Sequence, residues 1–171
     1  MKRIRLSNRE IKELANSLGK LGEVLREADV VEIVEVEGGK AIYIVDGIPA
    51  LYKSSITSLG EFVIPTLYLI HKTPMGQKIT VMYPAVGVDA GAVKHILNGA
   101  DVMRPGIREI AGDFERGEPL FILDDKRRTI AVGISLYSRR ELENLERGKV
   151  VHNVHYLGDK IWRLALELAK E

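Results

Sequence analysis

One short stretch of the chain combines glycines, a proline and basic side chains: VDAGAVKHILNGADVMRPGI, residues 88–107. A phosphate-binding loop places glycines and free backbone N–H groups at the N-terminus of a helix. Here Asp89 is expected at that end as an N-cap, with its carboxylate where a phosphate would have to bind. The P-loop pattern G-x-x-x-x-G-K-S/T is absent. A nucleoside triphosphate site is therefore not expected.

The sequence also contains no clear pattern for a metal site or a catalytic nucleophile. His152 and His155, in the sequence HNVH, are spaced as in some metal sites. On a strand, however, residues three apart point to opposite faces, and no third ligand is evident. The chain has no cysteine and no G-x-S-x-G motif. We therefore expect no metal, no cofactor and no catalytic residue.

The overall composition limits the kinds of partner. A net charge of +1 and a pI near 7.9 mean that any surface for a polyanion must be a local patch. The absence of cysteine indicates a reducing compartment, and we expect the cytoplasm. No apolar run reaches the roughly 18 residues of a membrane span, and the first residues lack a signal-peptide pattern. No membrane association is predicted.

The elements that would position these residues differ between the two halves of the chain. In the first half, the capping-box pair Ser7 and Glu10 predicts a helix from Asn8. Leu21, Val24 and Leu25 predict a second short helix, or a continuation of the first after a break at Gly19 and Gly22, that ends before Asp29. A hairpin is expected at 30–46, and strands at 49–53 and 62–67. The polar segment KTPMGQK, residues 72–78, predicts the boundary between two domains, 1–76 and 77–171.

The pattern of short strands and helices in the second half of the sequence predicts a small barrel-like sheet with short helices. ITVMY, residues 79–83, is expected to be a strand, and the helix that follows ends near Asn98, with Gly99 as a left-handed cap and RPGI as a turn. Further strands are expected in PLFILD, TIAVGISLY and KVVHNVHYL. A second capping box, Ser138 with Glu141, and a last helix from Asp159 complete an α+β fold.

Four segments, taken in order, carry a resemblance to a known family. They are VDAGAVKHILNGADVMRPGI, FERGEPLFIL, IAVGISLYS and ERGKVVHNVHYLGDKIW, and together they resemble the PUA domain, an RNA-binding module named after pseudouridine synthases and archaeosine transglycosylases. FVIPTLYLIHK and NVHYLGDKIW are similar to the branch of the malignant T-cell-amplified and translation-machinery-associated proteins. This resemblance implies an N-terminal α/β pre-PUA domain, followed by a PUA pseudo-β-barrel of about six strands with short helices.

The resemblance also implies where RNA would bind: at the end of the short helix, on the glycine-containing loop after it, and on an edge formed with the last strand. The matching positions are Lys94, Asn98, Gly99, Ala100, Asp101, Met103, Arg104, Pro105, Gly106, Lys149, His152 and Asn153. Glycines allow a ribose-phosphate chain to approach the backbone closely, while Lys94 and Arg104 supply positive charge. Unpaired bases could pack on Met103 or His152.

These features predict a non-catalytic RNA-binding protein of translation, because the segment before the PUA region is too short for the catalytic domain of the PUA enzymes. The partners implied are a structured RNA, a tRNA-like end or ribosomal RNA, together with the small ribosomal subunit or an initiation-factor-like protein. One alternative is an RNA-binding accessory subunit of an RNA-modification or ribosome-biogenesis enzyme. Another is a protein-binding scaffold.

Overall fold

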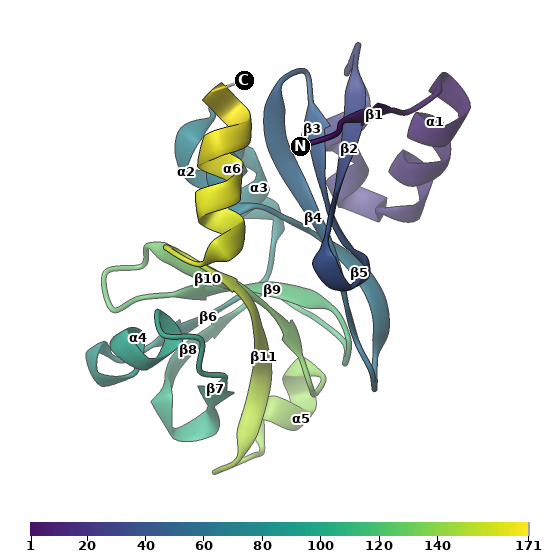
Figure 1. Cartoon of the computed structure of the whole chain (residues 1–171). Helices are drawn as coiled ribbons and strands as arrows, with labels where there is room; N and C mark the ends of the chain where they lie inside the picture. Colours follow the sequence, from purple (N-terminus) through teal and green to yellow (C-terminus); the bar gives the residue numbers. More distant parts are fainter. Residues whose placement is uncertain (171) are drawn as a thin grey trace. The chain divides into compact units, whose positions relative to one another are not determined.

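The structure is a computed structural model that describes residues 1–170 of the chain (Figure 1). The chain divides into two compact units. The first comprises Met1–Ile79 and the end of the chain from Leu164, and the second comprises Thr80–Arg163.

This grouping differs from the expected division at both ends of the second unit. The expected boundary lies after residue 76, and the whole C-terminal helix is expected in the second domain. In the structure the end of that helix groups with the first unit. A long-range hydrogen bond accounts for part of this: the guanidinium of Arg3 donates to the Leu168 carbonyl at 2.8 Å.

The first unit is built on a five-stranded antiparallel sheet in the order β1-β2-β3-β4-β5. Its elements are β1 (Ile4–Arg5), α1 (Asn8–Ser17), η1 (Gly19–Leu25), β2 (Val31–Val36), η2 (Glu37–Gly39), β3 (Lys40–Val45), β4 (Ile48–Ile56), β5 (Gly60–Pro65), α2 (Leu67–Lys72) and most of α3 (Met75–Met82). The predicted capping box is confirmed, because Ser7 Oγ accepts from the Glu10 N–H and Glu10 Oε1 accepts from the Ser7 N–H. The β2–β3 hairpin is confirmed as well.

The strand predicted at 79–83 is wrong, because this segment ends a helix. α3 buries Gly76 and Ile79, while Val81 is 87% exposed. Buried positions three apart followed by exposed ones are typical of a helix. A short apolar run has no periodicity of its own that separates a strand from a buried helical turn. Tertiary packing decides the matter, since Gly76 lies closely against the backbone of Ile70.

The second unit is a six-stranded sheet in the order β7-β11-β10-β9-β6-β8. Neighbouring strands are antiparallel except for the parallel pair β6–β9. Its elements are β6 (Ala85–Val88), α4 (Ala90–Ile96), β7 (Val102–Met103), η3 (Arg104–Gly106), β8 (Ile107–Ala111), β9 (Pro119–Leu123), β10 (Thr129–Ser135), α5 (Arg139–Glu143), β11 (Lys149–Tyr156) and the start of α6 (Lys160–Lys170). These elements confirm the predicted α+β class. None of the helices between residues 1 and 170 has the length and apolar character to cross a membrane.

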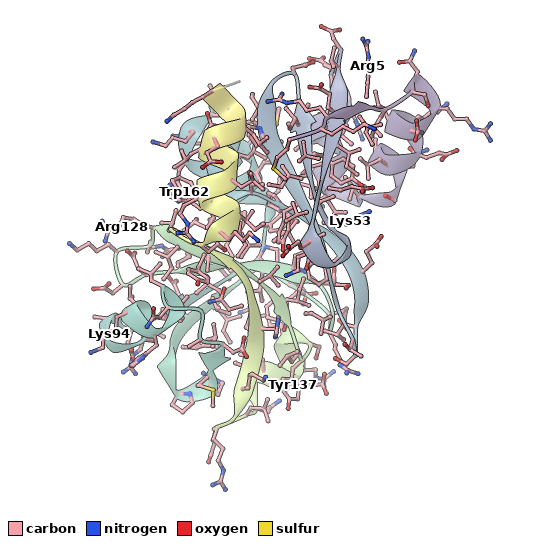
Figure 2. All side chains as sticks on the ribbon, viewed as in Figure 1. Arg5, Lys53, Lys94, Arg128, Tyr137 and Trp162 are labelled. Carbon is pink, nitrogen blue, oxygen red and sulfur yellow. The ribbon has the colours of Figure 1, made fainter. Side chains whose placement is uncertain are left out.

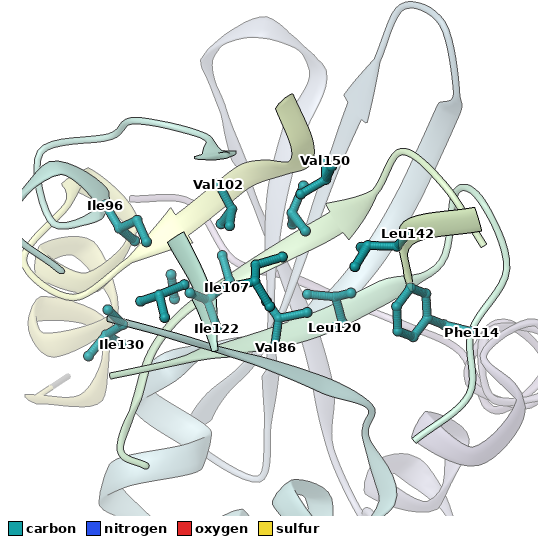
Figure 3. Packing of buried hydrophobic residues seen from close by; sticks show 13 residues of the cluster. Val86, Ile96, Val102, Ile107, Phe114, Leu120, Ile122, Ile130, Leu142 and Val150 are labelled. Carbon is teal, nitrogen blue, oxygen red and sulfur yellow. The ribbon is translucent and has the colours of Figure 1, made fainter. Parts of the chain in front are cut away.

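A continuous apolar core holds the second unit together. Figure 3 shows Phe114, Leu120 and Leu142 gathered at one end of it, with Ile96 and Ile130 toward the other. Ile96 comes from α4 and Val102 from β7, and both are almost completely buried. The core therefore fixes the two ends of the exposed loop that joins α4 to β7.

Candidate functional site

The N-terminal end of α4 is occupied by the side chain of Asp89. Asp89 Oδ1 accepts a hydrogen bond from the Ala92 N–H at 2.9 Å, which confirms the predicted N-cap. Its other carboxylate oxygen lies 3.3 Å from a guanidinium nitrogen of Arg108. This end of the helix is satisfied by the chain's own groups, so the candidate site lies at the opposite end.

The C-terminal end of α4 turns sharply at Gly99. Gly99 has a φ of +95°, the left-handed conformation predicted for it, and its N–H donates to the Ile96 carbonyl at 3.0 Å. The Ala100 N–H donates to the His95 carbonyl at 2.9 Å. A Cβ at Gly99 would lie 3.5 Å from the ring of Tyr156. The loop 98–101 therefore lies against the end of β11.

Asn153 on β11 connects this loop to the sheet. Its Nδ2 donates to the carbonyls of Ile96 at 3.0 Å and Ala100 at 2.9 Å, while its backbone N–H donates to Asp101 Oδ1 at 2.8 Å. The Oδ1 atom of Asn153 is buried and has no hydrogen-bond partner among the described residues. The Asn153 amide is thus engaged within the protein and positions the loop.

Asp101 is surrounded by basic side chains from β11. Lys149 Nζ lies 3.2 Å from Asp101 Oδ2, and His152 Nδ1 lies 3.6 Å from Asp101 Oδ1. The side chain of Asp101 is 24% exposed, against 50% for Lys149 and 39% for His152. The carboxylate is therefore the more enclosed group, and the side chains of Lys149 and His152 are more exposed to solvent.

β7 and η3 complete this edge of the sheet. Met103 is paired with Lys149 across the β7–β11 ladder and is 51% exposed. The Arg104 N–H donates to the Gly148 carbonyl at 2.8 Å, and Arg104 Nε donates to the Leu142 carbonyl at 3.0 Å. The Arg104 guanidinium is thereby held toward α5, with nitrogen atoms beyond Nε left for other contacts.

Comparison with known proteins identifies the two units. Residues 84–157 match the PUA domain, and residues 2–73 match a domain of unknown function, DUF1947. The chain is also 33% identical over 166 residues to a protein of Methanocaldococcus jannaschii, an alignment that covers 94% of this chain and 95% of that protein. The chain belongs to the PUA-domain family. The predicted resemblance and fold class are confirmed.

Two further relatives are similar to this chain over most of its length. Translation machinery-associated protein 20 of Saccharomyces cerevisiae is 29% identical over 154 residues, which cover 86% of this chain and 79% of that protein. A crystal structure described as a PUA domain from Aeropyrum pernix, in a tartrate complex, superposes with a TM-score of 0.75 at 29% identity, covering 98% of this chain and 92% of that chain.

The PUA domain brings most of the twelve predicted residues to one edge. The hydrogen bonds, ion pairs and strand pairing given above connect eight of them: Gly99, Ala100, Asp101, Met103, Arg104, Lys149, His152 and Asn153. Gly106 lies elsewhere, beside Ala92, and its carbonyl accepts from the Asp89 N–H. Pro105 shares η3 with it. Asn98 is exposed in the loop, and Lys94 extends from α4 (Figure 2).

One contact of the PUA domain was not anticipated from the sequence. His155 is fully buried, and its Nδ1 lies 2.9 Å from Asp159 Oδ2. The Asp159 carboxylate also accepts from the backbone N–H groups of Tyr156 and Trp162. The sequence feature that could have predicted this contact is the spacing of four residues between His155 and Asp159, an aspartate at the start of a helix. Residues 1–170 contain no group of three or more His, Asp or Glu side chains that could hold a metal.

The Asn153 side chain should stabilise the loop 98–101 and the folded protein. Asn153→Ala removes one hydrogen bond to the end of α4 and one to the loop, and should lower the free energy of unfolding by about 1 to 2 kcal/mol, since one net bond is worth about 1 kcal/mol. Hydrogen exchange at the amides of Gly99 and Ala100 should accelerate more than in the β9 strand. Asn144→Ala, which removes a bond from an exposed amide to the Arg140 carbonyl, is the matched control. Equal protection of the loop in both variants would contradict the positioning role.

Proposed function

We propose that the protein is a non-catalytic RNA-binding protein that acts in translation, and that RNA binds to the edge formed by the end of α4, β7 and β11. The observation that carries the proposal is the PUA match over residues 84–157, which includes all twelve predicted positions. The family resemblance implies that a domain of this kind binds RNA. The eight connected residues supply one surface on which a polynucleotide could lie.

The chemistry of this edge suits a polynucleotide. Lys94, Arg104 and Lys149 offer cations for phosphates, which dominate the affinity of nucleic-acid binding. Leu97 and Met103, 36% and 51% exposed, are two of the five large hydrophobic side chains exposed on the described chain. Cations beside exposed apolar side chains are typical of surfaces that bind phosphates and pack against unpaired bases.

The translational role rests on the relatives. A homologue that aligns with 86% of the chain is named translation machinery-associated protein 20. We infer that this protein also works with the translation machinery, in the cytoplasm, through the small ribosomal subunit or an initiation-factor-like protein. The first unit, which matches DUF1947, is then the part available for protein or ribosome contacts.

Binding of tRNA and of ribosomal RNA fragments tests the proposal. Lys94→Ala combined with Arg104→Ala should weaken binding about 25-fold near 0.1 M salt, because each lost phosphate contact on a single strand is worth about fivefold there, and the salt slope should fall by about 1.4. The charge-matched control is Lys126→Ala with Arg127→Ala, in the turn between β9 and β10. A filter-binding titration over a series of salt concentrations measures both quantities.

Two outcomes would contradict this proposal. The first is that the unsubstituted protein binds neither RNA at moderate salt. The second is that the control pair weakens binding as much as the Lys94 and Arg104 pair, which would place the contact surface elsewhere. Co-purification tests the translational role separately: recovery of ribosomal subunits supports it, whereas recovery of an RNA-modifying enzyme supports an accessory role in RNA modification.

A further inference from the structure

Asp101 is the one acidic residue among the twelve positions of the candidate edge, and it lies at its centre. Its Oδ2 is 3.2 Å from Lys149 Nζ, its Oδ1 accepts from the Asn153 N–H at 2.8 Å, and His152 Nδ1 is 3.6 Å from the same oxygen. A surface that bound phosphate by charge alone would gain nothing from a carboxylate at this place. Attraction between basic side chains and phosphates therefore does not account for the Asp101 carboxylate on this edge.

We propose that Asp101 is a specificity-determining residue, whose carboxylate neutralises Lys149 and so weakens the binding of polyanions that do not fit this surface. The inference rests on the proposed RNA binding and concerns which nucleic acids the edge accepts. It assigns Asp101 a role against phosphate, opposite to that of Lys94 and Arg104.

The geometry supports this role in two steps. A phosphate that approaches Lys149 also approaches the Asp101 carboxylate, and at distances beyond the 3.2 Å separation of the pair the attraction and the repulsion largely cancel. Lys149 is half exposed, so it can leave Asp101 and swing toward a ligand. Asp101 is 24% exposed and is held by the backbone N–H of β11, so it stays.

An RNA that fits the edge can offset this repulsion, whereas an unstructured polyanion cannot. Asp101 is an acceptor without a proton to donate, so it favours a ligand that presents a hydroxyl or amine hydrogen there and disfavours a phosphate oxygen. Specificity that arises from a repulsive element against the wrong ligand is a general device of recognition surfaces. On this edge the repulsive group is the Asp101 carboxylate.

The test compares two probes, an oligo-dT strand and tRNA. Asp101→Asn keeps an Oδ1 acceptor for the Asn153 N–H and removes the charge. It should tighten oligo-dT binding about fivefold near 0.1 M salt and steepen the salt slope by about 0.7, the contribution of one phosphate contact on a single strand. Binding of tRNA should tighten less, so the preference for tRNA over oligo-dT falls.

Two variants separate this mechanism from a general change of charge. Asp125→Asn alters the net charge equally but is exposed in the turn between β9 and β10, outside the candidate edge, and it should leave both affinities within about a factor of 1.5 because salt screens exposed charges. Lys149→Gln added to Asp101→Asn should abolish the gain. Asp101→Ser, which also keeps an acceptor, replaces Asp101→Asn if thermal melting shows that the asparagine variant is unfolded.

The results distinguish failure of this inference from failure of the proposed function. If the unsubstituted protein does not bind tRNA, the proposed function fails. If it binds tRNA but Asp101→Asn binds oligo-dT no more tightly, the specificity role of Asp101 fails alone. A gain that is matched by Asp125→Asn, or that survives Lys149→Gln, also overturns the role of the Asp101–Lys149 pair.

Discussion

Asp159→Ala is expected to lower the free energy of unfolding by about 3 to 5 kcal/mol, because the buried His155 ring and two backbone N–H groups lose their acceptor, at about 1 to 3 kcal/mol for each buried group left without a partner. Asp159 is 9% exposed and His155 is completely buried, with Nδ1 only 2.9 Å from the carboxylate. The same carboxylate accepts from the Trp162 N–H at 2.8 Å at the start of α6, so the substitution also removes a helix cap. Urea unfolding at neutral pH measures the loss.

The pH dependence of this effect follows from the pKa of Asp159. Burial raises the pKa of the carboxyl, but the hydrogen bond and the electrostatic attraction from His155 and the backbone N–H donors of Trp162 and Tyr156 outweigh burial, so the pKa lies below the ordinary 3.8. A carboxyl whose pKa is lower in the folded state stabilises the protein above the unfolded-state pKa, and this stabilisation is lost as the pH falls through the folded-state pKa.

Asp159→Asn is the matched variant for this test, because its Oδ1 can still cap the helix while the charge is gone. The stability difference between the native protein and Asp159→Asn should be full at neutral pH and should shrink as the pH falls below about 3.8. A difference that stays constant from neutral pH to pH 3 would show that the hydrogen bonds of Asp159, and not its charge, stabilise this part of the PUA domain.

Gly133→Ala should lower the free energy of unfolding by about 1 to 3 kcal/mol, the usual cost of overpacking a core, and should also weaken RNA binding. Gly133 lies at a bulge of β10 opposite β11. A Cβ there would lie 2.6 Å from Val151 Cγ1 and 2.7 Å from the His152 carbonyl oxygen. Because one of these atoms is backbone, β11 itself must shift, and β11 carries His152 and Asn153 of the candidate edge.

The control for this prediction is another glycine of the same domain. Gly91 lies on α4, and a Cβ there would meet only the Asp89 side chain, at an ordinary 3.5 Å. Gly91→Ala should raise stability by about 0.5 to 1 kcal/mol, through the better helix propensity of alanine. Chemical unfolding and tRNA titration of both variants give the result. Unchanged RNA binding by a folded Gly133→Ala protein would show that the candidate edge tolerates a displaced β11.

The sequence alone was sufficient wherever the signal was local. Ser7, Asp89 and Ser138 were predicted as helix caps, and each side chain accepts from an N–H three residues ahead. Gly99 was predicted in the left-handed conformation and has it. These features depend on the chain within a few residues of each position, so composition and spacing determine them. The family resemblance likewise depended on four local segments and on their order along the chain.

Only the tertiary structure decided which predicted residues meet and what they do. Whether residues 79–83 form a strand or a helix depended on packing against α2, which a short apolar run does not encode. Asn153 was predicted to contact RNA, yet its amide binds the Ile96 carbonyl, 57 positions away in the chain. The pairing of Asp101 with Lys149 arises in the same way, because β7 and β11 lie side by side in the sheet although they are far apart in the chain. Such contacts depend on strand order and register, which are set by the core as a whole and not by any local segment.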